Sequence, residues 1–268
     1  MLRIISFLLF SLFSLSAICA TYPINLTPEQ TKQLGNLIWK NEGQQKIEHL
    51  TTWNHSEDFP SLGLGHFIWY PTDEKGPFKE QFPQLLTFMS DNGVQLPTWL
   101  AQANVSPWKS REQFYAAFDD AQLTELRVLL SEQLQLQTQF IILRLEQAIP
   151  SILESSTALQ QKMIEEHLNQ LSTPEGIFSL LDYVNFKGEG VNLKERYQGE
   201  GWGLKQVLLA MPVYTDNPLR SFGYAADEVL TRRVKNAPRD EQRWLKGWRV
   251  RVHAYQNLSI TDPKEEKR

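Results

Sequence analysis

Helix-start signals followed by apolar residues at helical spacing constrain this fold more than any other feature of the sequence. Thr27-Pro28-Glu29-Gln30 supplies an N-cap, a first-turn proline and a capping-box glutamine, and apolar residues continue at helical spacing to Ile38 before Gly43. This pattern predicts a helix over 28–42. Similar patterns predict helices over 79–91, 97–103, 111–148 with at least one break, 157–171, 174–186, 202–211, 219–235 and 240–256.

The segment 51–70 has a different pattern. Thr, Trp, Phe and Ile cluster there around Asn54, Pro60, Gly63 and Gly65, which is typical of a small β-hairpin or a three-strand ribbon. Because strand signals are concentrated in this segment, we expect an α+β, predominantly α-helical fold with one small sheet near the N-terminus.

Charge bears on the class of partner, and chain length bears on whether the fold needs disulfides. The 27 Lys and Arg residues against 31 Asp and Glu give a net charge of -4, so no basic field favours nucleic acid as a partner. A chain of 268 residues can bury a large core, so the single cysteine, Cys19, is not needed for stability.

The first twenty residues have the pattern of an export signal. A short positive start at Met1–Arg3 precedes an apolar run over 4–18, and small residues near Ala20 suit a signal peptidase. An uncleaved anchor is the alternative, although the run is short for a membrane span. We therefore expect a protein exported to the periplasm or the extracellular space, without stable membrane insertion after cleavage.

Metal and cofactor chemistry have no sequence signature here. The five histidines form no His-Glu-x-x-His motif and have no cysteine partners, and there is no Gly-x-Ser-x-Gly motif. No phosphate-binding glycine loop follows a predicted strand. The sequence therefore predicts no metal and no cofactor.

Glu42 is the first candidate for a catalytic residue. It borders the apolar stripe of the first predicted helix, and Gly43 places it at the C-terminal end, where the helix dipole is negative. Both effects disfavour the ionised form of a carboxyl, which is what a general acid requires. The alternative is a solvated glutamate in the last turn of a helix.

The residues that follow strengthen this hypothesis. Asn41-Glu42-Gly43, followed by Ser61-Leu62-Gly63-Leu64-Gly65-His66 in the predicted ribbon, resembles the phage-type lysozymes of the lysozyme-like superfamily. The resemblance implies a lysozyme-like fold and cleavage of peptidoglycan or a similar amino-sugar polymer. It also implies that Glu42 protonates the glycosidic oxygen, that Ser61 holds water or a substrate edge, and that His66 ties the hairpin together.

The second carboxylate of that family has no direct counterpart. Its position, six residues before Ser61, is His55, so the nearest candidates are Glu57 and Asp58. An ordinary acidic turn is the alternative for this pair. If neither reaches the site, a single glutamate could act as acid and base, as in the related lytic transglycosylases, where a sugar hydroxyl replaces water.

Further residues are candidates for substrate binding. The segment 180–188, with Asn185, resembles the buried helix that ends in Phe-Asn-x-Gly in phage-type lysozymes, and the Arg-rich segment 243–251 resembles their closing helix. Glycines allow close approach of a ligand and aromatic faces suit sugar rings. On these grounds the remaining candidates are Trp53, Trp69, Tyr197, Gln198, Glu200 and Trp202. Packing of Trp202 in the core is the alternative.

These observations give a domain plan and two functional hypotheses. The plan has a signal peptide over 1–20, a lysozyme-like domain over 21–260 and a polar tail over 261–268. The domain divides into a hairpin lobe over 44–71, a helical insertion over 72–172 and a C-terminal helical lobe over 173–256. The first hypothesis is an exported glycan-cleaving enzyme, and the second is a catalytically incomplete envelope protein that binds cell-wall glycan or a partner protein.

Overall fold

The computed structural model describes residues 22–76 and 78–260, which form a predominantly helical fold with two small antiparallel sheets. The predicted leader over 1–20 and the polar tail over 261–268 lie outside the described residues. The α+β, predominantly helical class is confirmed. The expectation of a single sheet is wrong, because a second sheet forms near residue 200.

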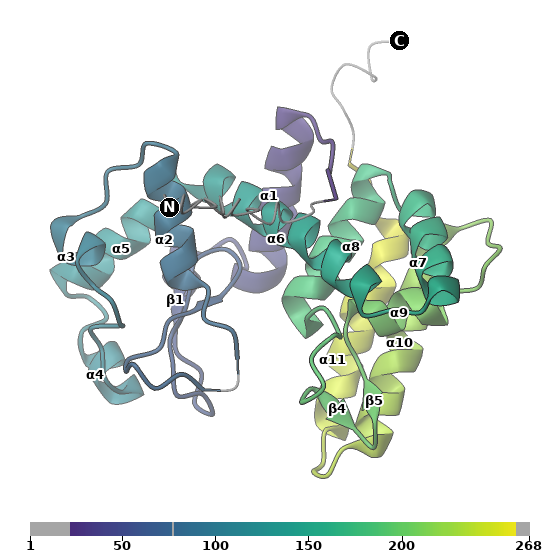
Figure 1. Cartoon of the computed structure of the whole chain (residues 1–268). Helices are drawn as coiled ribbons and strands as arrows, with labels where there is room; N and C mark the ends of the chain where they lie inside the picture. Colours follow the sequence, from purple (N-terminus) through teal and green to yellow (C-terminus); the bar gives the residue numbers. More distant parts are fainter. Residues whose placement is uncertain (1–21, 77, 261–268) are drawn as a thin grey trace, which may run out of the picture.

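Two lobes lie on either side of α1 (Pro28–Gly43), as Figure 1 shows. We call residues 47–132 the ribbon lobe and residues 158–257 the helical lobe. The long helix α6 (Leu134–Glu154) joins them, because it packs against α2 at one side and against α7 and α8 at the other.

The ribbon lobe is built around a three-stranded antiparallel sheet in the order β1-β2-β3, as the sequence predicts. Aromatic and aliphatic side chains from the sheet and from the surrounding helices form its core. Its elements are η1 (Ile47–Leu50), β1 (Thr51–Thr52), β2 (Ser61–Leu62), β3 (Phe67–Ile68), α2 (Phe82–Asp91), α3 (Thr98–Ala101), α4 (Arg111–Ala116) and α5 (Ala121–Glu132).

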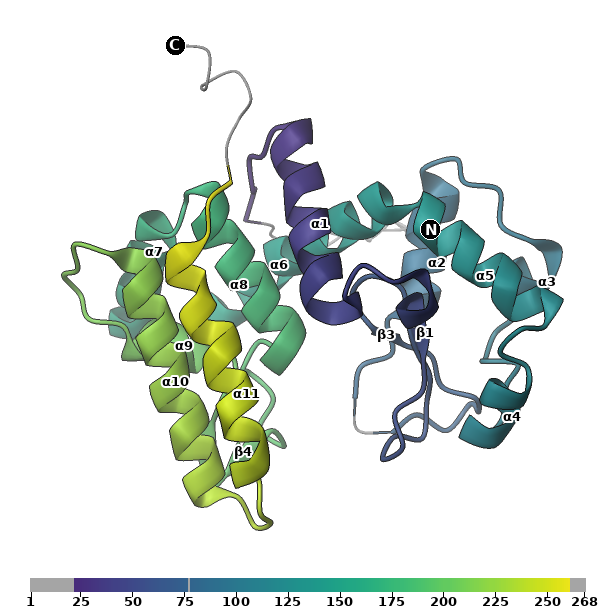
Figure 2. The ribbon, with the colours of Figure 1, turned by 180° about the vertical axis from the view of Figure 1, so that it is seen from behind.

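The helical lobe contains a pair of long helices, α10 and α11, that lie side by side in Figure 2. Helix α10 also packs on α8 and α9, and α7 packs on α9. The elements are α7 (Ala158–Gln170), α8 (Pro174–Lys187), β4 (Arg196–Tyr197), β5 (Glu200–Gly201), α9 (Leu204–Ala210), α10 (Pro218–Asn236), α11 (Gln242–His253) and η2 (Ala254–Asn257). The segment 72–172 therefore contributes to both lobes. Within the described residues, no helix is both long and apolar enough to cross a membrane.

Helix α1 follows the sequence prediction at both ends. The Thr27 side chain accepts a hydrogen bond from the backbone N–H of Gln30, whose side chain accepts one from the backbone of Thr27, so the capping box is formed. Gln44 ends the helix in a left-handed conformation with φ of 49°. Its apolar face, with Leu34 and Ile38, is buried, and α1 packs on α6. This packing fixes where the end of α1 points.

Candidate active site

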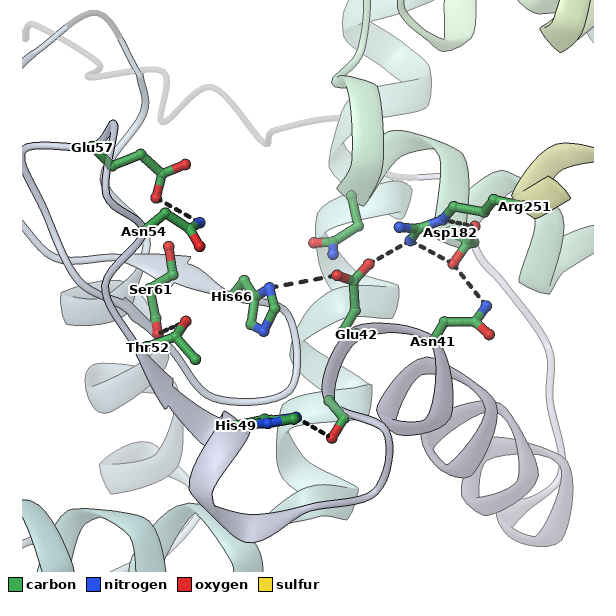
Figure 3. A network of polar contacts seen from close by, with 12 residues as sticks. Asn41, Glu42, His49, Thr52, Asn54, Glu57, Ser61, His66, Asp182 and Arg251 are labelled. Atoms are coloured by element: carbon green, nitrogen blue, oxygen red, sulfur yellow. Dashed lines mark hydrogen bonds and ion pairs between the residues drawn. The ribbon is translucent and has the colours of Figure 1, made fainter. Parts of the chain in front are cut away.

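Glu42 lies at the end of α1, between the two lobes (Figure 3). Its side chain is only 13% exposed. Oε1 accepts a hydrogen bond from Nη2 of Arg251 in α11, and Oε2 lies 3.4 Å from Nδ1 of His66 in the β2–β3 loop. Glu42 is therefore not a solvated last-turn glutamate, because the helical lobe contacts one oxygen and the ribbon lobe faces the other.

Arg251 is held in turn by Asp182, a buried residue of α8. Nε and Nη2 of Arg251 donate to the two carboxylate oxygens of Asp182, each at 2.8 Å. Asp182 also accepts from the hydroxyl of Tyr255 at 2.6 Å and from Nδ2 of Asn41 at 3.4 Å. Although burial opposes the charged form, Asp182 and then Glu42 raise the pKa of Arg251 above its usual value. Arg251 is therefore a permanent cation that forms an ion pair with Glu42, a partner that the sequence did not indicate.

The loop that carries His66 is fixed to α6. The backbone N–H of Leu64 donates to Oε1 of Gln137 at 2.7 Å, and Nε2 of the same buried amide donates to the carbonyl of Leu130 at 2.6 Å. Gly63 has φ of 74°, and its carbonyl accepts from the backbone N–H of His66 at 3.2 Å. His66 itself is left-handed with φ of 48°, and its side chain is 30% exposed. The glycine spacing in the motif thus serves the turn that directs His66 to Glu42.

The structure does not bring the other acidic candidates to Glu42. The carboxylate of Glu57 accepts from Nδ2 of Asn54 at 3.0 Å at the tip of the ribbon, apart from Glu42 in Figure 3. Asp58 is exposed beside it. Ser61 lies in β2, where its carbonyl accepts from Oγ1 of Thr52 at 3.3 Å and where only 5% of the residue is exposed. The carboxylate that the fold does place near Glu42 is Asp182, on the far side of Arg251.

Trp53 and Trp69 are core residues, which corrects their assignment as sugar platforms. Trp53 packs edge-to-face on Phe114, and its Nε1 donates to the carbonyl of Glu57 at 2.7 Å. Trp69 is fully buried and packs against Phe82 and other aromatic rings of the ribbon lobe. A buried ring has no free face on which a sugar could stack, so these residues stabilise the lobe.

The glycine-rich segment near residue 200 folds as the β4–β5 hairpin, with Gln198 and Gly199 at its turn. Tyr197 donates from its hydroxyl to Oε1 of the buried Glu241 at 3.0 Å, and its ring lies 4.5 Å from that of Trp202. Trp202 is buried, which supports the alternative that it packs in the core.

The exposed residues of this hairpin are Gln198, Gly199 and Glu200. Glu200 forms an ion pair with Arg232 of α10 at 3.6 Å. Among the described residues, no hydrogen bond or ion pair joins the hairpin to Glu42, so these interactions do not support substrate binding by this segment next to Glu42.

Asn185 lies one turn after Asp182 in α8, on the same side of the helix. Its Oδ1 accepts from Nη1 of Arg144 in α6 at 3.3 Å. Burial lowers the pKa of Arg144 to about 10, although the charge of Glu189 raises it. Asn185 therefore links the helix that carries Asp182 to the helix that joins the two lobes.

Three members of this site have no recognised motif in the sequence: Arg251, Asp182 and Tyr255. The sequence does carry a signal for Asp182, because it is a lone acidic residue within the apolar run of α8. A buried charge needs a partner, so this position indicates an ion pair. Arg251 was noted only as part of an Arg-rich helix. Its contact with Glu42 joins residues far apart in the sequence, and no local pattern indicates it.

Comparison of the chain with models of protein families, with curated proteins and with solved structures found no significant match. In residues 22–76 and 78–260, no group of three or more His, Cys, Asp or Glu side chains is arranged to hold a metal ion.

Proposed function

We propose that the chain is a lysozyme-like enzyme that cleaves glycosidic bonds in peptidoglycan or a similar amino-sugar polymer, with Glu42 as the catalytic carboxyl. The observation that carries the proposal is the placement of Glu42 between two lobes, with one oxygen held by Arg251 and the other facing the partly exposed His66. The order of the elements, a helix that ends at Gly43 directly after Glu42 and then a glycine-containing ribbon, supports it as well.

In this mechanism Glu42 gives a proton to the glycosidic oxygen as the bond to the sugar breaks. Oε2 is the oxygen available for this proton, because Arg251 holds Oε1. When the proton leaves, Arg251 stabilises the carboxylate that forms, and this preorganised charge favours the transfer. The carboxylate can then act as a base toward the nucleophile that attacks the sugar.

The contacts favour a mechanism with a single catalytic carboxylate. A two-carboxylate mechanism needs a second group on the other face of the sugar. Glu57 is engaged by Asn54 at the ribbon tip, and Asp182 is engaged by Arg251 and Tyr255. The nucleophile is then a hydroxyl of the sugar itself, which makes the reaction that of a lytic transglycosylase.

A second candidate function is a protein of the cell envelope that binds glycan without cleaving it. The observation that favours this candidate is the direct ion pair between Glu42 and Arg251, a permanent cation that already engages one oxygen of the carboxylate. Both candidates use the same region between the lobes. They differ in whether Glu42 gives a proton to the bound glycan.

Export is part of the proposal and is based on the sequence of residues 1–20. Expression of the full chain in a bacterial host, followed by mass spectrometry of the periplasmic and medium fractions, tests it. We expect a mature protein that begins near residue 21. A full-length chain in the membrane fraction would instead indicate the uncleaved anchor.

The test of the reaction is clearing of purified cell walls by the wild type, Glu42→Gln and Glu57→Gln. We expect clearing by the wild type and by Glu57→Gln, and none by Glu42→Gln, with all three equally folded. Mass spectrometry of the products identifies the nucleophile, because attack by the sugar's own hydroxyl gives a fragment lighter by one water than hydrolysis does. Clearing by Glu42→Gln would refute the assignment, and wall binding without clearing by the wild type would support the second candidate.

A further inference from the structure

An open groove of about 810 Å³ lies on the ribbon lobe, far along the chain from Glu42. It runs between α3 with its flanking residues and α5, which are neighbours at the outer end of the lobe in Figures 1 and 2. Its volume is within the range of small-molecule sites. The lining residues are Gln95, Leu96, Pro97, Thr98, Trp99, Gln102, Glu125, Val128, Leu129 and Glu132.

Trp99 is the aromatic residue of the groove, and two contacts fix its orientation. Its Nε1 donates to Oε2 of Glu125 at 2.8 Å. Its ring packs edge-to-face on the buried Trp108, with 6.2 Å between the centroids. Because the ring is partly exposed and already held in place, the Trp99 side chain loses little conformational entropy when a ligand stacks on it.

Polar side chains surround this ring and are available to a ligand. Gln95, Gln102 and Glu132 are exposed, and no hydrogen bond or ion pair within the described part of the chain engages their side chains. Val128, which is 48% exposed, and Leu96 supply apolar surface beside them. The groove thus combines an aromatic face with amide and carboxylate groups at its edges.

We propose that this groove binds an uncharged saccharide chain, with one sugar ring stacked on Trp99. A pyranose ring has an apolar C–H face and hydroxyl groups at its edge, which match the indole and the surrounding amides and carboxylates. The two carboxylates, Glu125 and Glu132, with no cation among the lining residues described, disfavour an anionic ligand. The open shape admits a chain rather than a single enclosed sugar. This site would hold glycan independently of Glu42.

Binding is tested by NMR with a neutral probe, an oligomer of N-acetylglucosamine. The chain has eight tryptophans, and the indole N–H signal of Trp99 is identified by its loss in Trp99→Phe. We expect the oligomer to shift this signal. Val128→Glu, which places a charge at the groove without removing core packing, should weaken binding about tenfold or more, which corresponds to ~1.4 kcal/mol. Val213→Glu is the matched control, because Val213 is 45% exposed in the other lobe.

The outcomes separate this proposal from its competitors. Glu125→Gln retains an acceptor for the indole N–H and should bind the neutral oligomer as the wild type does. An unshifted Trp99 signal, or unchanged affinity in Val128→Glu, would overturn the proposal. Binding of only the deacetylated, cationic oligomer would overturn it in favour of a charge-based site. The remaining indole signals report whether each variant is folded. In Glu42→Gln the oligomer should shift the Trp99 signal as in the wild type, which separates failure of this site from failure of the proposed reaction.

Discussion

Arg251 donates two hydrogen bonds of 2.8 Å to the buried carboxylate of Asp182, and its Nη2 also donates to Glu42. The pair is bidentate, which fixes the plane of the guanidinium as well as its position. Asp182 therefore positions Arg251, and Arg251 positions Glu42. Because the side chain of Asp182 is 1% exposed, loss of either partner leaves a buried charge without compensation.

The first prediction concerns this pair. Asp182→Asn should lower the free energy of unfolding by about 3–5 kcal/mol, because it leaves the Arg251 charge with too few partners. Urea denaturation measures the change. The control is Asp227→Asn, whose partners Arg249 and His253 are 44% and 39% exposed, and it should cost at most ~1 kcal/mol. Equal losses in the two variants would contradict the argument from burial.

His66 allows stability and function to be separated. Its φ of 48° is left-handed, a region that asparagine tolerates better than alanine. The free energy of unfolding of His66→Asn should therefore be within about 0.5 kcal/mol of the wild-type value, whereas that of His66→Ala should be lower by about 1 kcal/mol. Both remove the imidazole that faces Glu42, so both should reduce the clearing of cell walls. Full clearing by His66→Asn would show that the imidazole serves only the turn.

The parts of the structure that the sequence predicts are those controlled by neighbouring residues. The capping box of Thr27 and Gln30 sets the start of α1, and the left-handed conformation of Gln44 after Gly43 ends it. The ribbon follows from turn residues within a few positions of one another. These local rules also place Glu42 at a helix end before a ribbon.

Residue type alone did not predict which aromatic residues are exposed. Trp53 and Trp69 are buried because α2 and α4 and their flanking residues cover the ribbon, and those helices follow it in the sequence. The partner of Glu42 was missed for a similar reason, since 209 residues separate it from Arg251. Such contacts depend on the tertiary fold, which local periodicity does not determine.

The second sheet was missed because its residues carry no strand signal. All strands of both sheets contain two residues, which is too short for an alternation of period two, so the first sheet was predicted from the Thr, Trp, Phe and Ile clustered over 51–70. The strand β5 consists of Glu200 and Gly201, residue types that are depleted in strands. The turn between β4 and β5 did carry a signal. Gln198 and Gly199 have φ of 51° and 83°, and a residue pair that ends in glycine favours such a two-residue hairpin turn.

Two glycines with open surroundings should respond to alanine with opposite signs. A Cβ would meet nothing within 4 Å at either Gly199 or Gly247. Gly199 has φ of 83°, so Gly199→Ala should destabilise the protein by about 1–2 kcal/mol. Gly247 lies inside α11, so Gly247→Ala should stabilise it by about 0.5–1 kcal/mol. Thermal unfolding of both variants measures this, and shifts of the same sign would contradict the prediction.

Lys187, at the end of α8, is held between two aromatic rings. Its Nζ lies 3.9 Å from the ring centroid of Phe186 and 3.7 Å from that of Trp248. Burial, followed by the charges of Arg233 and Arg251, lowers the pKa of Lys187 to about 6. Cation–π contacts of about 0.5–2 kcal/mol each favour the charged amine and offset only part of this effect.

The last prediction follows from the direction of that change in pKa. Between pH 6 and the ordinary lysine value of 10.5, the unfolded chain binds a proton that the folded chain lacks, so Lys187 makes stability rise with pH. Lys187→Met removes this contribution. It should increase the free energy of unfolding at pH 7 by about 1–2 kcal/mol, and stability should then rise less steeply up to pH 10. Urea titrations at several pH values measure both effects. Lys235→Met, at an exposed position of α10, is the control and should leave the pH dependence unchanged. An unaltered slope in Lys187→Met would mean that the rings keep the amine charged.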